Sequence, residues 1–212
     1  MWALGAHPHC VQLFNAWEQQ GQLYLQTELM DNSSLDRFLD DYGQHEPLSE
    51  ERVWYIFSHV ALGLKHMHDL NILHLDVKPA NVFISEDWTL KLADFGMSAR
   101  LPLAANEFDR EGDREYIAPE VLTGCYDKPA DIFSLGLLLL EVTANVVLPD
   151  NGPAWQKLRS GDLSDCQFDA GTSSELVDLI TEMLQPLPED RPTIDQIVGH
   201  PCVAKALASL TS

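Results

Sequence analysis

The sequence predicts an α+β fold, with short β-strands before residue 93 and helices in most of the rest of the chain. Two observations lead to this class. Short apolar or alternating runs separated by polar turns occur within residues 11–25 and 82–92. From Ser49 onward, apolar residues recur at helical spacing in longer segments. A chain of 212 residues is long enough for one large core or two small lobes.

The first strands are expected at residues 11–14 and 23–25, joined by a polar turn at residues 19–22. A second pair is expected at residues 82–84 and 90–92, joined by the polar residues 85–89. This second hairpin determines where the polar residues on either side of it lie, because the start of its first strand and the end of its second strand lie next to each other.

Polar residues flank that second hairpin. It would bring Asn81 and Asp94 to the same end, and an amide with a carboxylate suits a hard cation such as Mg²⁺. Asp76 and Lys78 come just before it, on a loop that Pro79 stiffens. This layout suits phosphoryl transfer, in which a carboxylate receives a substrate hydroxyl, an ammonium meets the phosphate and two groups hold metal.

Helices are expected in the remainder. Ser49 and the two glutamates after it make a plausible start for a helix over residues 49–68. Its apolar face would consist of Val53, Ile56, Phe57, Val60, Leu64 and Met67. Residues 132–148 are apolar but include Glu141 and Asn145, so a helix buried in a soluble core fits better than a membrane span. Residues 172–175 read as a capping box for a later helix.

Composition excludes several classes of partner. The net charge of -20 argues against nucleic acid and anionic membrane as main partners. The four cysteines are far apart and show no metal-type pairing, which favours reduced thiols in a nuclear or cytosolic protein. A histidine metal site is a weaker alternative, because His66 and His68 point to different sides of a helix.

The residues around the second hairpin resemble the eukaryotic protein kinases, whose catalytic loop runs H-x-D-x-x-x-x-N and whose metal motif is D-F-G. The matching residues are His74, Asp76 and Asn81 in the first motif, and Asp94, Phe95 and Gly96 in the second. The resemblance implies a protein-kinase-like fold, with a complete, mainly helical large lobe and a small lobe truncated at its N-terminal side.

The resemblance also assigns roles to individual residues. The catalytic residues would be Asp76, Lys78 and Asn81, with Asn81 and Asp94 binding Mg²⁺. ATP would lie between the hinge and Phe83. Its pocket would consist of Thr27 as gatekeeper, Glu28 and Met30 of the hinge, Phe83 as floor, and Asp94.

Three further contacts follow from the resemblance. His74 would pack beneath Phe95 and connect the catalytic loop to the metal motif. Asp131 would anchor the backbone of the catalytic loop. Arg191 would pair with Glu120, the last residue of an A-P-E motif that closes the activation segment.

Part of the kinase pattern is missing from these residues. There is no G-x-G-x-x-G, and the first lysine is Lys65, inside the predicted helix. Residues 2–4 resemble the end of the regulatory helix of the family. We therefore expect residues 1–30 to be a remnant of the small lobe and residues 31–212 to be the large lobe. The 212 residues alone should have little kinase activity.

Further details resemble the Wee and Myt kinases, most of all fungal members. These details are His74-Leu75-Asp76 without arginine, and residues 111–116, 145–152 and 155–162. The resemblance implies transfer of phosphate from ATP to a tyrosine, and in Myt types also a threonine, of a cyclin-dependent kinase, which delays mitosis. A monomer in the nucleus or cytoplasm would then be expected. Thr27 is closer to the Myt pattern, but the two branches stay open.

Two rival functions also stay open. A pseudokinase or interaction module would keep the large lobe without catalysis, and a generic serine/threonine kinase would differ only in substrate. The activation segment adds one constraint. Residues 101–115 contain no Ser, Thr or Tyr, and Leu75 replaces the arginine that would read a phosphate. We expect ion pairs to order this span, from Arg110 and Arg114 with neighbouring acids and from Asp113 near Lys78.

Overall fold

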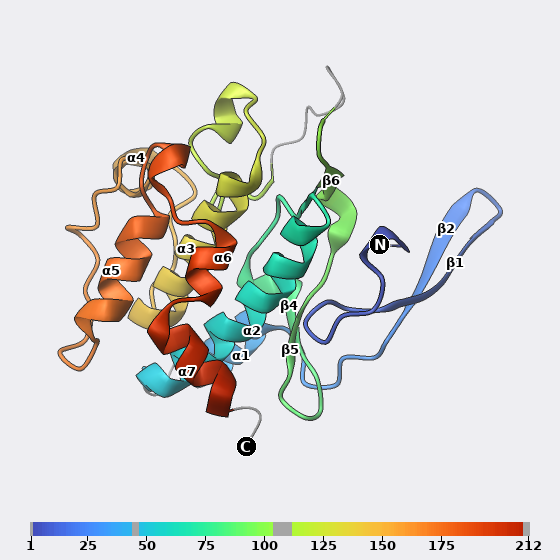
Figure 1. The fold of residues 1–212 in the computed structure, drawn as a ribbon, viewed down its shortest axis with the longest axis horizontal. Helices are drawn as coiled ribbons and strands as arrows, with labels where there is room; N and C mark the ends of the chain where they lie inside the picture. Colours follow the sequence, from blue (N-terminus) through green and yellow to red (C-terminus); the bar gives the residue numbers. More distant parts are fainter. Residues whose placement is uncertain (1, 44–46, 104–111, 210–212) are drawn as a thin grey trace.

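The computed structural model describes residues 2–43, 47–103 and 112–209. Figure 1 shows an antiparallel β-ribbon beside a larger, mainly helical body. The ribbon consists of β1 (Leu13–Gln19) and β2 (Gln22–Thr27). Both predicted strands and the turn between them are therefore confirmed, although β1 begins two residues later than expected. A short 3₁₀ turn, Trp2–Leu4, precedes the ribbon.

The helical body also contains two small antiparallel sheets. β3 (Ile72–Leu73) pairs with β6 (Ala99–Arg100), and β4 (Val82–Ile84) pairs with β5 (Leu90–Leu92), which confirms the second hairpin. The helices are α1 (Leu35–Gly43), α2 (Glu50–Asp69), α3 (Lys128–Ala144), α4 (Gly152–Arg159), α5 (Ser174–Met183), α6 (Ile194–Val198) and α7 (Pro201–Ser209). The predicted α+β class with a mainly helical large part is therefore confirmed.

The helix α2 buries the apolar face that the sequence predicted. Val53, Phe57, Val60, Leu64 and Met67 are each at most 1% exposed. Two glutamates occupy its first turn, where the positive end of the helix dipole favours negative charge. Because α2 packs against α3, α6, α7 and β5, it forms the centre of the large core.

The helix α3 is the buried helix expected from the apolar stretch. Asp127 caps its N-terminus by accepting a hydrogen bond from the Lys128 amide at 2.7 Å. Its apolar residues are buried on all sides, as is typical of a helix inside a core. At Gly136 a Cβ would lie 2.9 Å from the Cβ of Met183, so only glycine permits this approach of α5. Among the described residues, no helix is both long and apolar enough to cross a membrane.

The start of α5 corrects the predicted capping box. Ser173, not Thr172, is the N-cap, and its Oγ accepts from the Leu176 amide at 3.3 Å. The role expected of Glu175 belongs to Glu50 of α2, which accepts from the Ser173 amide at 2.8 Å and from its hydroxyl at 2.7 Å. The sequence pattern missed this acceptor because it lies 123 residues away.

The predicted pair between Arg191 and Glu120 is confirmed. The Arg191 side chain is fully buried and makes a two-pronged contact with the Glu120 carboxylate, at 2.6 and 2.8 Å. The same guanidinium donates to the carbonyl oxygens of Pro129, Gln185 and Pro186, at 2.9, 2.7 and 3.1 Å. It thereby joins the end of the activation segment to the region after α5.

We predict that Arg191→Ala lowers the free energy of unfolding by roughly 3–5 kcal/mol, because it leaves the Glu120 carboxylate and three carbonyl groups without their donor. Denaturant unfolding of the purified protein measures this change. Lys157→Ala is the control, because it removes an exposed pair with Asp165 and should leave stability unchanged within error. A loss below about 1 kcal/mol for Arg191→Ala would contradict the assignment.

Candidate active site

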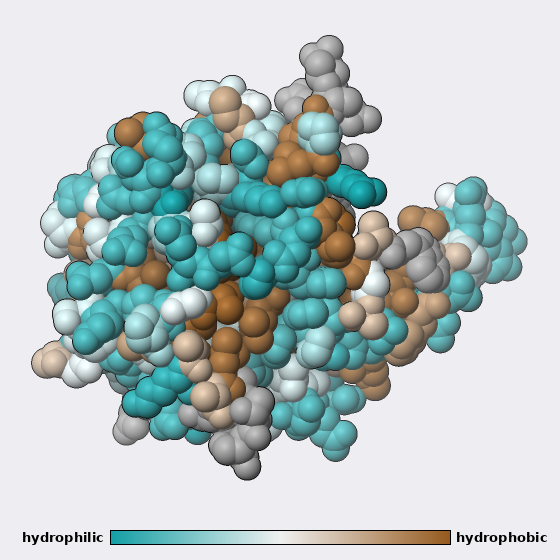
Figure 2. Space-filling model, in the orientation of Figure 1, coloured by the Kyte–Doolittle hydropathy of each residue, from teal (hydrophilic) through white to brown (hydrophobic). Residues whose placement is uncertain are grey.

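A cavity of about 770 Å³ lies between the β-ribbon and the β4–β5 hairpin. Figure 2 shows hydrophobic surface on the part of the molecule that contains the ribbon. In β2 the side chains of Leu23 and Leu25 are 70% and 52% exposed. Both side chains line the cavity. The residues that the sequence assigned to an ATP pocket line it as well: Thr27, Glu28, Met30, Phe83 and Asp94. The structure therefore brings these five residues to one cavity, while their contact with ATP stays a prediction.

The backbone of Glu28 is only partly free to bind a ligand. Its amide donates to the Gln12 carbonyl at 3.0 Å, and its carboxylate accepts from the Gln12 amide at 2.8 Å. The same carboxylate pairs with Lys91 at 2.6 Å. The Glu28 carboxylate is thus held by contacts within the protein, whereas no hydrogen bond to its carbonyl is found among the described residues. The Met30 amide makes no hydrogen bond to a described residue, and its role as a donor to a ligand stays a prediction.

The buried carboxylate of Asp131 holds the backbone of the catalytic loop, as predicted. Asp131 accepts from the backbone amides of His74 at 2.9 Å and Leu75 at 2.7 Å, and it contacts His68 Nε2 at 2.9 Å. Burial acts to raise the pKa of Asp131, but the hydrogen bond and charge of His68 and the loop contacts outweigh it and hold the pKa below its usual range. Asp131 is therefore anionic and can hold Leu75 at a φ of 62°.

The His74 ring connects this loop to the metal motif. Its Nε2 donates to the Ala93 carbonyl at 3.0 Å, and its Nδ1 accepts from the Asp76 amide at 3.2 Å. Burial lowers the pKa of His74, so the ring is neutral and Nδ1 can accept. The ring centroid lies 5.6 Å from that of Phe95, which confirms the predicted contact.

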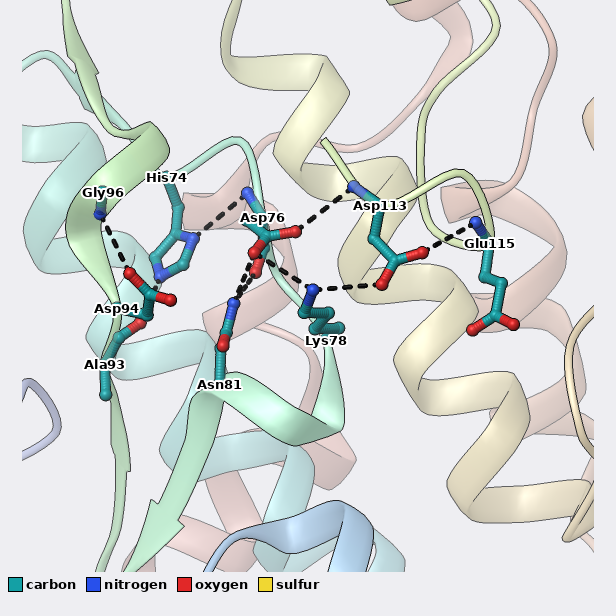
Figure 3. Close-up of polar contacts among 9 residues, drawn as sticks. All are labelled: His74, Asp76, Lys78, Asn81, Ala93, Asp94, Gly96, Asp113 and Glu115. Atoms are coloured by element: carbon teal, nitrogen blue, oxygen red, sulfur yellow. Dashed lines mark hydrogen bonds and ion pairs between the residues drawn. The ribbon is translucent and has the colours of Figure 1, made fainter. Parts of the chain in front are cut away.

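The predicted catalytic residues form one hydrogen-bonded group (Figure 3). Asn81 Nδ2 donates to the Asp76 carbonyl at 2.8 Å and to Asp76 Oδ2 at 2.7 Å. Lys78 Nζ lies 3.2 Å from the same oxygen of Asp76. These contacts fix the Asp76 carboxylate and leave Asn81 Oδ1 without a partner among the described residues. An amide oxygen in that state is suited to a metal ion.

The second candidate metal ligand lies at the same end of the hairpin. Val82 pairs with Leu92, and the Ala93 amide donates to the Asn81 carbonyl at 2.9 Å, which brings the segment of Asp94 next to Asn81. Asp94 has a φ of 52°, and its Oδ1 accepts from the Gly96 amide at 3.2 Å. The donor set of one amide and one carboxylate oxygen therefore fits a hard divalent cation.

Part of the activation segment docks onto the catalytic loop. Asp113 accepts from Lys78 at 3.0 Å, as predicted, and its amide donates to Asp76 Oδ1 at 3.4 Å. A Cβ at Gly112 would lie 2.6 Å from the Leu75 carbonyl oxygen, so this approach requires glycine. Arg114 makes no ion pair with a described residue. Arg110 and the acids at 107, 109 and 111 lie outside the described residues.

A buried pair between Tyr116 and Glu141, which the sequence did not predict, anchors the activation segment at Tyr116. The Tyr116 hydroxyl donates to the Glu141 carboxylate of α3, and Ser134 Oγ donates to the Tyr116 carbonyl at 2.8 Å. Burial raises the pKa of Glu141 to about 7, and the charges of nearby acids contribute. Glu141 was visible in the sequence only as a charge inside an apolar run, a signal that marks a partner without identifying it.

Comparison with known proteins places these residues in context. The protein kinase domain model matches residues 1–203. The chain is 52% identical over 218 aligned residues to the mitosis inhibitor protein kinase wee1 of Schizosaccharomyces pombe, which covers 93% of this chain and 25% of that protein.

Two other relatives are similar. The mitosis inhibitor protein kinase SWE1 of Saccharomyces cerevisiae is 51% identical, covering 74% of this chain and 20% of its own length. The membrane-associated tyrosine- and threonine-specific cdc2-inhibitory kinase of Drosophila melanogaster is 43% identical, covering 92% and 36%. The chain thus spans between a fifth and about a third of the lengths of these relatives.

We predict that Glu141→Gln flattens the pH dependence of stability. With a folded-state pKa of about 7 against 4.5, the folded state holds the proton more tightly, so this group's contribution is full below pH 4.5 and is lost as the pH rises toward 7. The variant should lack this decline, whose slope can reach about 1.4 kcal/mol per pH unit. Urea unfolding across this range measures it.

The control for the loss of one carboxyl group is Glu51→Gln, which changes an exposed glutamate at the start of α2. The neighbouring groups that influence the pKa of Glu141 are Tyr116, Glu115, Asp36 and Asp40, and both variants keep all four. If Glu141→Gln had the same pH slope as the unmodified protein, Glu141 would be ionised throughout the range.

Proposed function

The chain belongs to the protein kinase family, and we propose that it is the catalytic part of a Wee/Myt-type kinase that phosphorylates a tyrosine of a cyclin-dependent kinase. The observation that carries the proposal is the fixed group of Asp76, Lys78 and Asn81 beside a cavity lined by the hinge and Asp94. The names of two relatives, which are 52% and 43% identical over most of this chain, supply the substrate class.

Asp76 is proposed to orient the substrate hydroxyl and to take its proton. One carboxylate oxygen accepts from Asn81 and faces Lys78, while the other accepts from the Asp113 amide. These contacts fix both oxygens before substrate arrives, which lowers the entropic cost of reaching a reactive geometry.

Lys78 is proposed to stabilise the phosphate in transfer. Burial acts to lower the pKa of Lys78, but hydrogen bonds and charges from Asp113 and Asp76 outweigh it and raise the pKa, so the ammonium keeps its charge. An ammonium held between two carboxylates is directed to one place, where it can offset the negative charge that develops on the transferring group.

A kinase domain uses ATP and a divalent metal ion, and we propose Mg²⁺ as that ion. Asn81 Oδ1 and Asp94 would hold it, and when bound it offsets charge on the phosphates. Adenine would contact the Glu28 carbonyl and the Met30 amide beside Thr27, with Phe83 below it. That the protein acts as a monomer, in the nucleus or the cytoplasm, stays a prediction.

We predict that Asp94→Asn lowers phosphoryl transfer by on the order of 10²–10³-fold or more, because it removes the charge that holds the metal. The assay is phosphorylation of a cyclin-dependent kinase by the full-length protein at saturating Mg-ATP. Thermal unfolding should be unchanged. The matched control is Asp87→Asn, which changes an exposed aspartate in the turn of the same hairpin. Turnover of Asp94→Asn within a few-fold of the unmodified enzyme would contradict the metal role and favour a non-catalytic module.

We also predict that activity is independent of phosphorylation between residues 101 and 115. This span has no hydroxyl side chain to accept phosphate, and Leu75 offers no cation to bind one. Treatment of the purified kinase with phosphatase should leave its turnover unchanged, with mass spectrometry as the control for complete dephosphorylation. A loss of turnover would show that a phosphate elsewhere in the protein maintains the active state.

A further inference from the structure

Helix α4 places two side chains against the activation segment. Trp155 and Arg159 are four residues apart and so lie on the same face of α4. Trp155 Nε1 donates to the Arg114 carbonyl at 2.7 Å, and Arg159 donates to the carbonyls of Arg114 at 2.8 Å and Glu115 at 3.1 Å. The Arg159 guanidinium also stacks on the Trp155 ring at 3.9 Å.

The Arg159 guanidinium is buried without a carboxylate partner among the described residues, which costs free energy. Arg159 is 6% exposed, yet no described carboxylate lies within ion-pair distance of it. Its Nε makes no hydrogen bond to a described residue. Burial and the nearby Arg114 lower the pKa of Arg159 to about 10. A buried guanidinium usually pairs with a carboxylate, whereas this one binds backbone carbonyls.

The segment that Arg159 binds also carries a catalytic contact. Asp113 precedes Arg114 and pairs with Lys78 at 3.0 Å, while its other oxygen accepts from the Glu115 amide at 3.2 Å. Four consecutive residues, 112–115, are therefore held on the catalytic loop by Asp113 and on α4 by the other contacts. A shift of the carbonyls at Arg114 and Glu115 would move Asp113.

We propose that Trp155 and Arg159 are positioning residues, a carbonyl clamp that holds residues 112–115 in the arrangement needed for protein-substrate phosphorylation. The clamp performs the ordering that a phosphate would perform in a segment with an acceptor residue, and it needs no modification. This inference rests on the proposed function, because it concerns residues that act through Asp113 and Lys78 on the same reaction.

The clamp should affect the protein substrate more than ATP. Residues 112–115 lie against Asp76, where a substrate hydroxyl must arrive. No described residue of α4 lines the cavity that contains Thr27, Met30 and Phe83. Loss of the clamp should therefore raise the KM for protein substrate and lower kcat, and leave the KM for ATP unchanged.

The test uses the full-length protein with three substitutions. Trp155→Phe keeps the ring but removes its N–H, and loss of one hydrogen bond predicts a fall in kcat/KM of about 5-fold. Arg159→Met removes the contacts with the carbonyls of Arg114 and Glu115, together with one to the Trp155 carbonyl within α4, and should lower kcat/KM by roughly 10- to 100-fold. Lys157→Gln is the matched control, because Lys157 lies on the same helix but pairs with Asp165 away from the segment. It should retain the unmodified activity.

Hydrogen–deuterium exchange is measured on the same variants in the absence of substrate, so that it tests the clamp independently of activity. The amides of residues 114–117 should exchange faster in Trp155→Phe and Arg159→Met, with the amides of α2 unchanged. If the unmodified protein fails to phosphorylate a cyclin-dependent kinase, the proposed function fails, while exchange still decides the clamp. Unchanged exchange and substrate KM in Trp155→Phe overturn it. A rise in the KM for ATP equal to that for substrate, with a lower unfolding temperature, also overturns it, because it indicates general destabilisation.

Discussion

The arrangement of the site depends on one buried carboxylate, Asp131. A carboxylate without water is costly unless hydrogen-bond donors replace the water, and here two backbone amides and the His68 ring do so. Because the two amides belong to His74 and Leu75, the same hydrogen bonds stabilise the charged carboxylate and fix the loop. From there the order propagates through short contacts, from the His74 ring to the Asp76 amide and the Ala93 carbonyl.

Much of this could be predicted from the sequence, because the decisive spacings are local. The period of apolar residues locates α2 and the β4–β5 hairpin, and the hairpin alone brings Asn81 and Asp94 to one end. The pairs made by Asp131 and by Arg191 span 56 to 71 residues, yet the family resemblance identified both. The period of apolar residues predicts that a helix or strand exists, whereas the family motifs predict which distant residue a side chain contacts.

The remainder could not be predicted, for physical reasons that differ among residues. Glu50, rather than Glu175, accepts the hydrogen bond at the start of α5, because the fold brings Glu50 next to Ser173 although it lies far away in the sequence. Glu28 lines the cavity as expected, but the sequence did not show that Lys91 and the Gln12 amide hold its carboxylate. Trp155 and Arg159 belong to a stretch whose composition was recognised, while their partners are backbone carbonyls, which have no signature in a sequence.

Two kinds of interaction hold residues 112–116, and their magnitudes decide which dominates. The Lys78 and Asp113 side chains are 20% and 32% exposed, so water still reaches this pair, and an ion pair near the surface contributes about 0.2–1 kcal/mol. Hydrogen bonds from a charged, buried group such as Arg159 are worth about 1.5–3 kcal/mol each and are screened far less. By these magnitudes the contacts from α4 contribute more to the order of the segment than the ion pair at Lys78 does. A segment ordered in this way keeps its arrangement at high salt, where one held by surface ion pairs would loosen.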